Sequence, residues 1–183
     1  MKWILPGLWI LTGTLFGQGT VIFSNSSANL VRFDPDPARV QAPNVPGDPV
    51  PAGARFMVGF YFAPAGTADP SSLVPFTGTV QIGPTAGLYR SATLPILIPD
   101  TSGVFQVRVW ESANGTSYEQ ALSRGTGYLG TTPLFTAPLT GTSPINVGAL
   151  APEIHVAFVP EPSTLALIAA GTAGLFLGRR RRG

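Results

Sequence analysis

The stretch Val104–Glu111, which reads VFQVRVWE, decides the fold of this chain. Alternate positions are apolar, and a period of two is typical of a strand in an antiparallel sheet that buries one face. The stretch therefore predicts such a strand. Its buried face consists of Phe105, Val107 and Val109, and its opposite face consists of Gln106, Arg108 and Trp110.

Similar alternation marks two other stretches. Phe56–Phe62 places four apolar side chains on one face, and Ile154–Phe158 alternates its apolar residues with His155 on the polar face. Shorter strands bounded by Gly, Pro, Asn or Asp are expected at Gly19–Ser24, Thr79–Ile82, Gly87–Ser91, Leu94–Ile98 and Pro133–Ala137. Many short, punctuated strands predict an all-β fold, an antiparallel β-sandwich of jelly-roll or immunoglobulin-like type.

One helix and one long loop interrupt this pattern. Thr116 followed by Glu119 fits a capping box, so we expect a two-turn helix that begins there and ends at Gly125. The stretch 34–51 is rich in proline, which removes backbone donors, and we expect it to form a surface loop.

The N-terminus has the three parts of a secretory signal peptide. Lys2 is followed by the uncharged, apolar run Trp3–Phe16 and then by the small residues Gly17 and Gly19. We assign residues 1–19 to this signal. Cleavage after Gly19 satisfies the small-residue rule best, and cleavage after Gly17 is the alternative.

The C-terminus carries a second targeting pattern. Pro160-Glu161-Pro162 precedes the apolar run Leu165–Leu177, and Arg179, Arg180, Arg181 and Arg182 follow it. The span 163–178 is about 24 Å long as a helix, shorter than the roughly 30 Å core of a bilayer. The arginines can snorkel to the headgroups, so we expect a single, marginal transmembrane helix. Basic residues stay cytoplasmic, which places the body on the far side of the membrane.

This tail resembles the PEP-CTERM sorting domain of exported bacterial proteins. The resemblance rests on Pro160-Glu161-Pro162, the apolar segment and the terminal arginines, and it covers residues 160–183. It implies recognition by an exosortase, a membrane-embedded enzyme that resembles cysteine transpeptidases. It also implies processing near the motif and transfer to the cell surface or extracellular matrix, in bacteria that produce exopolysaccharide.

Composition limits what residues 20–159 can do. These residues hold six arginines and eight acidic residues, a net charge of −2, which does not indicate a nucleic-acid binder. The chain has no cysteine and one histidine, so thiol chemistry is excluded and a zinc site is not expected. We expect neither catalysis nor a cofactor.

Three functions remain open for this body. The first is a structural protein of the cell surface or matrix. The second is a carbohydrate-binding module for exopolysaccharide, in which exposed Trp110, Tyr118 and Tyr89 stack on sugar rings. The third is a glycoside hydrolase that uses Glu111 and Glu119 as its carboxylate pair. Asp34-Pro35-Asp36 is also a weak match to a calcium-binding loop.

Overall fold

The two longest described strands pair with each other at the centre of the main sheet. In the computed structural model, which describes residues 18–76, 78–97, 101–139 and 144–160, β3 (Gly53–Pro64) and β7 (Ser102–Glu111) form a long antiparallel ladder. The ladder runs from the Phe56–Glu111 pair to the Pro64–Gly103 pair. This pairing holds the apolar faces of both strands on the same side of the sheet.

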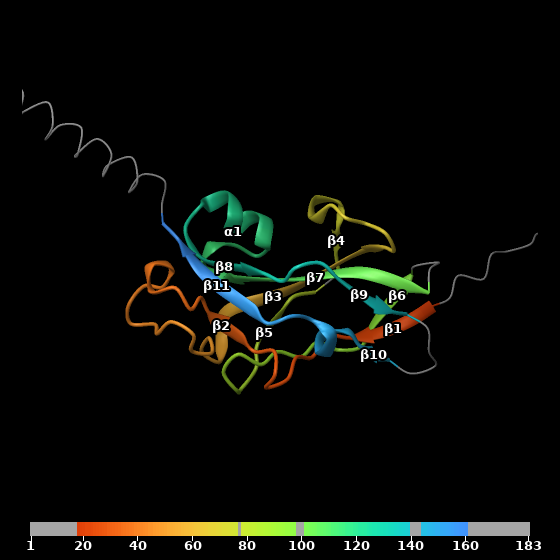
Figure 1. The fold of residues 1–183 in the computed structure, drawn as a ribbon, viewed down its shortest axis with the longest axis horizontal. Coiled ribbons are helices and arrows are strands. Elements are labelled where there is room, and N and C mark those ends of the chain that lie inside the picture. The colour runs from red at the N-terminus through yellow and green to blue at the C-terminus, as the bar shows by residue number, and fades with distance from the viewer. Residues whose placement is uncertain (1–17, 77, 98–100, 140–143, 161–183) are drawn as a thin grey trace, which may run out of the picture.

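The remaining strands complete two sheets (Figure 1). The main sheet has the order β2-β11-β8-β7-β3-β4, with β5 paired to β3 and β9 paired to β7, and the smaller sheet has the order β10-β1-β6. The shorter strands of the main sheet are β2 (Val31–Phe33), β4 (Val74–Pro75), β5 (Val80–Ile82), β8 (Gly127–Thr131), β9 (Phe135–Pro138) and β11 (Ile154–Val159). Those of the smaller sheet are β1 (Gln18–Ile22), β6 (Leu94–Leu97) and β10 (Ile145–Asn146).

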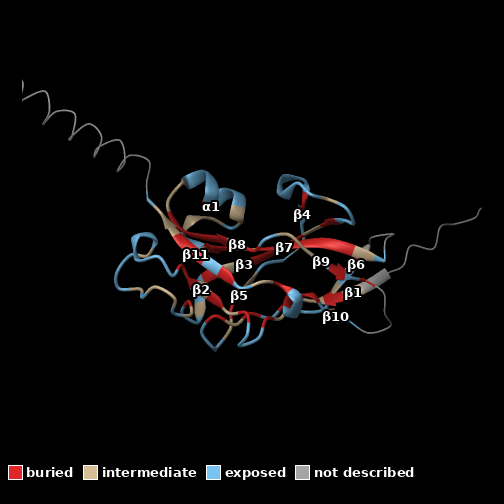
Figure 2. Cartoon of the chain, viewed as in Figure 1, coloured by how far each residue is buried: buried red, intermediate tan, exposed pale blue. Residues whose placement is uncertain are grey.

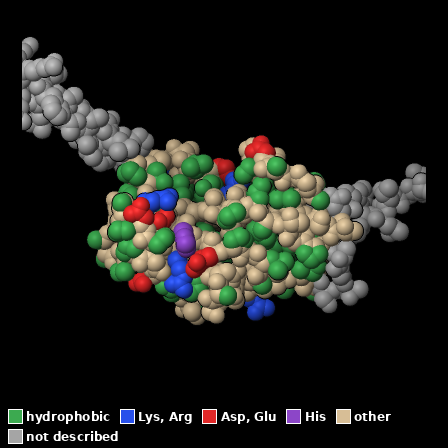
Figure 3. All heavy atoms as spheres, in the orientation of Figure 1, with side chains coloured by type: hydrophobic (Ala, Val, Ile, Leu, Met, Phe, Trp, Pro, Cys, Tyr) green, Lys and Arg blue, Asp and Glu red, His purple; other side chains and the backbone are tan. Residues whose placement is uncertain are grey.

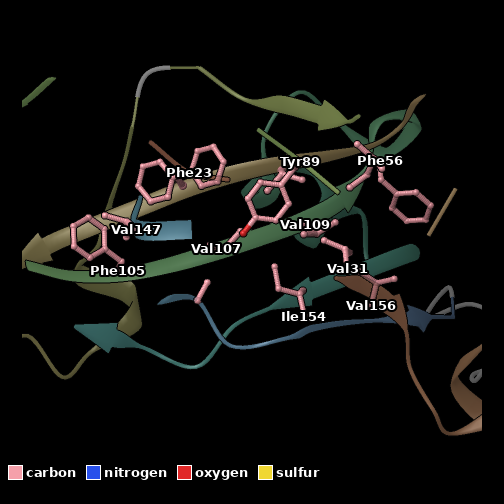
Figure 4. Close-up of a cluster of buried hydrophobic side chains, with 14 of the residues drawn as sticks. Phe23, Val31, Phe56, Tyr89, Phe105, Val107, Val109, Val147, Ile154 and Val156 are labelled. Atoms are coloured by element: carbon pink, nitrogen blue, oxygen red, sulfur yellow. The ribbon is translucent and has the colours of Figure 1, made fainter. Parts of the chain in front are cut away.

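The principal hydrophobic core fills the space between the sheets (Figure 4). Phe23, just after β1, stacks on Phe60 of β3 with ring centroids 4.0 Å apart, and it meets Phe105 of β7 edge-on at 6.0 Å. The predicted inner face of β7 is confirmed, since its phenylalanine and both valines are fully buried. Figure 2 shows the same burial along the long strands.

The opposite face of the main sheet is also covered. Helix α1 (Tyr118–Arg124) packs Ala121 against Trp110 and Leu129, and a second small cluster joins Tyr61, Ala63 and Leu73. Trp110 is consequently fully buried and Gln106 is 6% exposed. The expectation that this face of β7 meets solvent is therefore wrong, because a helix and the segment before β4 lie over it.

Most expected strands are present, with several changes. Gly87–Ser91 forms only isolated bridges, at Tyr89 and Arg90. The strands β2, β4, β8 and β10 were not predicted. The helix begins one residue later than the capping-box pattern suggested, because Ser117 is the N-cap and its hydroxyl accepts a hydrogen bond from the Gln120 amide. It ends as predicted, at Gly125 in the left-handed conformation (φ 66°).

Both predicted targeting segments lie largely outside the described residues. Strand β1 begins at Gln18, which pairs with Leu97, and Gly19 pairs with Ile96. Of the two predicted cleavage positions, only the one after Gly17 leaves β1 intact. Within the described part of the chain, no helix has the length and apolar character needed to cross a bilayer, and the predicted span 163–178 falls outside that part.

Candidate functional site

A polar groove of about 430 Å³ opens on the outer face of the main sheet. It is lined by residues from the turn after β2, from α1, from β8 and the segment after it, and from β11 with the residues before it. Its lining is Asp34, Arg39, Tyr118, Leu129, Gly130, Thr131, Pro133, Glu153, His155 and Ala157. In Figure 3 the histidine side chain lies among basic and acidic side chains on this face of the molecule.

Ion pairs organise the charges of this groove. Arg39 binds Asp34 at 2.8 Å, and Arg32 binds Glu153 at 2.7 Å. The second carboxylate oxygen of Glu153 lies 3.4 Å from Nε2 of His155, whose side chain is 42% exposed. The prediction that His155 occupies the solvent side of its strand is therefore confirmed. Each acid of the groove already has a basic neighbour, so the arrangement suits binding of a polar ligand better than proton transfer.

Close packing of backbone forms part of the groove wall. A Cβ atom on Gly130 would lie 2.5 Å from the carbonyl oxygen of His155 and 2.9 Å from a methyl carbon of Val156. Only glycine permits β8 to approach β11 this closely.

The Asp34-Pro35-Asp36 turn is held by its own carboxylates. Oδ1 of Asp34 accepts a hydrogen bond from the Asp36 amide, and Oδ1 of Asp36 accepts one from the Ala38 amide. These contacts cap the 3-10 turn Pro37–Arg39. No group of three acidic or histidine side chains suited to a metal ion occurs among the described residues, so the match to a calcium loop finds no support.

A second polar cluster lies between α1 and the main sheet. Arg108 donates to Oε1 of Gln106 at 2.8 Å, to Oε1 of Glu119 at 2.9 Å and to the carbonyl oxygen of Pro70 at 2.9 Å. Its guanidinium carbon lies 3.9 Å from the centroid of the Tyr61 ring, in a cation–π contact. One arginine therefore joins the sheet, the helix and the segment before β4.

The same cluster shifts the ionisation of two groups. The Tyr61 hydroxyl donates to Oε2 of Glu119 at 3.1 Å. Burial and then this bond raise the pKa of Tyr61 above its usual range. Partial desolvation alone would raise the pKa of Glu119, but its hydrogen bonds and the charge of Arg108 together lower it. Tyr61 is therefore a neutral hydrogen-bond donor and Glu119 an ionised acceptor. Each side-chain nitrogen of Arg108 makes a hydrogen bond, so we call this cluster around Arg108 the structural clamp.

The predicted sugar-stacking aromatics are not displayed together. Trp110 is fully buried and donates its indole N–H to the Gly115 carbonyl, and Tyr89 is 2% exposed. Both were expected on the surface, so that prediction is wrong for these two rings. Trp110 is buried because α1 covers the outer face of the main sheet. Tyr89 is buried because it belongs to the core between the two sheets. Tyr118 alone is partly accessible, and it lines the groove.

The two glutamates considered for hydrolysis have separate structural partners. Glu111 pairs with Arg55 at 3.0 Å and accepts a hydrogen bond from the Tyr128 amide, whereas Glu119 belongs to the clamp around Arg108. Neither lines the groove. Sequence reasoning did not find the groove, because its charged residues come from segments more than a hundred positions apart and form no motif.

The body runs directly into the C-terminal tail. The Phe158–Tyr128 and Val159–Gly127 pairs close the ladder between β11 and β8, and exposed Pro160 follows immediately. The other predicted sorting residues, Glu161, Pro162 and Arg179–Arg182, lie outside the described residues.

Comparison with known proteins identifies this tail. Residues 158–182 match the PEP-CTERM protein-sorting motif. The chain matches no curated protein and no solved structure, so residues before the motif are assigned to no family. The motif identifies the tail as that of an exported protein addressed to an exosortase, and it implies that the tail is membrane-associated.

Proposed function

We propose that this protein is exported, held in the membrane by its C-terminal tail, and then cut by an exosortase and transferred to the cell surface or extracellular matrix. There its two-sheet body acts as a structural component without catalysis of its own. The observation that carries this proposal is the sorting motif at residues 158–182, which begins within the last strand of the body.

The position of that strand supports a cut within the tail. β11 lies between β2 and β8, so it is an interior strand of the main sheet. A cut before Ile154 would remove an interior strand and expose the edges of both neighbours, which invites aggregation. A cut after Pro160 leaves the whole sheet intact, as release of a functional body requires.

The polar clusters support a structural role. Glu111 and Glu119 are each bound by an arginine and a further donor. Within the described part of the chain, neither hydroxyl of the groove lining, on Thr131 or Tyr118, makes a hydrogen bond to His155 or to a groove carboxylate. Carboxylates held in this way stabilise a fold and are poorly suited to act as general acids.

Mass spectrometry of the mature protein tests the sorting proposal. In cells with an active exosortase, the surface-extracted protein should lack the terminal arginines. Replacing Pro160, Glu161 and Pro162 with alanine should leave an uncut, membrane-bound form. The chain supplies a matched control in Pro35-Asp36-Pro37, an exposed proline–acid–proline sequence whose replacement should leave sorting unchanged. A wild-type chain that still ends in Gly183 in such cells would contradict the proposal.

The groove favours a second candidate function, binding of a polar saccharide of the matrix. Tyr118 offers part of a ring, while the acidic, basic and histidine side chains around it offer donors and acceptors. Titrating the body with a panel of bacterial polysaccharides tests this candidate. His155→Ala should weaken a binding interaction that Arg90→Ala, at an exposed site outside the groove lining, leaves unchanged. Equal affinities of the two variants would exclude the groove as the binding site.

A further inference from the structure

The tail leaves the body at one defined end. β11 runs parallel to β2 and antiparallel to β8, so the last residue of β11 lies where β2 ends and β8 begins. Helix α1 leads into β8 at the same end, and the loop after β2 extends there too (Figure 1). We refer to the loop 35–46, the C-terminal half of α1 and the end of β11 as the tail-exit end.

Exposed apolar side chains occur at this end. Among the described residues, four large hydrophobic side chains are exposed, and two of them, Val45 and Leu122, are each 54% exposed and belong to the tail-exit end. Val45 lies in a fixed loop, because the neighbouring Asn44 donates to the Tyr128 hydroxyl at 3.0 Å. Leu122 lies on α1, three residues before the left-handed glycine that ends the helix.

The other two exposed hydrophobics lie away from the tail. Val74 pairs with Phe62 of β3, whereas Phe56 of β3 pairs with Glu111 at the end of β7 that is nearest the tail. Six residues of strand separate Phe56 from Phe62, a distance of about 20 Å. Leu150 lies before the start of β11, and that strand alone spans about 17 Å. Val74 and Leu150 are each 51% exposed. They therefore match Val45 and Leu122 in exposure and differ from them in position.

The connection between the body and the apolar run is short. Only Pro160, Glu161 and Pro162 separate Val159 from Ser163, where the predicted span begins. Four Cα–Cα steps of at most about 3.6 Å give a reach of about 14 Å. The headgroup layer on each side of a bilayer core is about 5–8 Å thick. A tail in the membrane therefore holds the tail-exit end at the lipid headgroups.

Three of the six arginines of the body lie at or beside this end. They are Arg39 in the loop, Arg55 of β3, which donates to Oδ1 of Asn44 in that loop at 3.2 Å, and Arg124 in α1. The first two pair with Asp34 and Glu111. Arg124 donates to the backbone carbonyl of Ala113 and makes no ion pair among the described residues, so it retains donors. A guanidinium with free N–H groups suits a lipid phosphate.

We propose that, while the tail is in the membrane, the body docks on the phospholipid headgroups through its tail-exit end, with Val45 and Leu122 between the headgroups and Arg124 on a phosphate. This inference rests on the proposed anchoring by the tail. The patch is small, and the short connection supplies the high effective concentration that makes a weak contact persist. Residues 18–160 without the tail should therefore not bind to phospholipid vesicles.

The absence of cysteine from the chain permits a direct test with single labels. The full chain is reconstituted in vesicles of phosphatidylcholine and phosphatidylglycerol that carry a quencher on the headgroup. A fluorophore is attached in turn to the cysteines of Val45→Cys, Leu122→Cys, Val74→Cys and Leu150→Cys. A fifth variant, Ala170→Cys, is labelled in the same way and measured in vesicles that carry the quencher in the acyl region. Quenching should be several-fold stronger at positions 45 and 122 than at positions 74 and 150.

The label at position 170 separates insertion of the tail in the membrane from docking of the body on the headgroups. Quenching at position 170 with equal quenching at the four body positions would overturn docking and leave the anchor standing. No quenching at position 170 would overturn the anchor, and docking with it. As a further check, Leu122→Ser should reduce quenching at position 45 at least twofold if both side chains meet the same surface, and an unchanged value would contradict docking.

Discussion

Replacing Tyr89 with phenylalanine should stabilise the body. The Tyr89 ring is 2% exposed and packs against Phe60 with centroids 5.7 Å apart. Its hydroxyl has no hydrogen-bond partner among the described residues, and Figure 4 shows the side chain within the cluster of buried hydrophobic residues. Burial raises the pKa of Tyr89 above its usual range, so the group stays a neutral, unsatisfied phenol.

The expected gain follows from the cost of that hydroxyl. A buried polar group without a partner costs about 1–3 kcal/mol, and phenylalanine keeps the ring while removing the group. We therefore expect Tyr89→Phe to raise the free energy of unfolding by about 1 kcal/mol. For a body of this size, that gain raises the melting temperature by about 4 °C.

Tyr128 provides the matched control. It is also 2% exposed, but its hydroxyl accepts hydrogen bonds from the Gln41 amide at 2.6 Å and from Nδ2 of Asn44 at 3.0 Å. Tyr128→Phe leaves the Gln41 amide without its acceptor, whereas Nδ2 of Asn44 keeps its bond to the Gln41 carbonyl oxygen at 3.1 Å. The change should lower the free energy of unfolding by about 1–2 kcal/mol. The same change of side chain therefore has opposite signs at the two positions.

Urea unfolding of residues 18–160 measures both effects. Far-ultraviolet circular dichroism follows the sheets, and the fluorescence of Trp110, the only tryptophan in this range, follows the outer-face cluster. The slopes with urea should match, so that the midpoints report stability alone. A loss of 1 kcal/mol or more in Tyr89→Phe would refute the reasoning, because it would show that the hydroxyl is hydrogen-bonded in solution.

Three further predictions concern the main sheet. Val107→Ala should cost about 2–4 kcal/mol and His155→Ala within about 0.5 kcal/mol, and a reversed order in urea unfolding would contradict the assigned faces of the two strands. Gln106→Ala should cost about 1–3 kcal/mol, because it removes a buried hydrogen bond to the Thr132 carbonyl oxygen and a partly buried one from Arg108, and a neutral result in the same assay would show that they contribute nothing. Against partial desolvation, the hydrogen bonds of Glu119 and then the charge of Arg108 lower its pKa in the folded state, so these contacts stabilise the body above pH 4.5 and their contribution is lost as the pH falls further. Melting curves against pH should therefore fall less steeply in acid for Glu119→Gln than for wild type, and identical slopes would exclude this contribution.

The long strands could be predicted from the sequence because their alternation is local. β3, β7 and β11 each carry apolar residues at every second position. Their predicted faces are buried, except that Phe62 of β3 and Phe158 of β11 are only partly buried. Strand β8 could not be predicted, because Gly127 and Gly130 interrupt it and its apolar and polar residues do not alternate. It becomes a strand through tertiary packing, since Gly130 lets it approach β11 at a distance that a side chain would prevent.

The cover over the outer face could not be predicted from β7 itself. Gln106 and Arg108 are polar, so alternation places them towards solvent, and only distant segments show otherwise. The Pro70 carbonyl and the Glu119 carboxylate both bind Arg108, although they lie 38 and 11 positions away in the sequence. The groove was unpredictable for the same reason, because ion pairs between remote segments leave no pattern in the sequence.

The order of strands in the main sheet relates folding to sorting. β2, near the start of the body, pairs with β11 at its end, as Val31 with Ile154 and Phe33 with Val156. β11 also joins β2 to β8, so the main sheet is complete only when the chain up to Val159 has crossed the membrane. The sorting motif, residues 158–182, overlaps the last two residues of β11 and continues directly beyond them. Under the proposed function, an exosortase that acts on the tail therefore meets a substrate whose body can already be folded, and its cut releases the tail without breaking a single pair of the sheet.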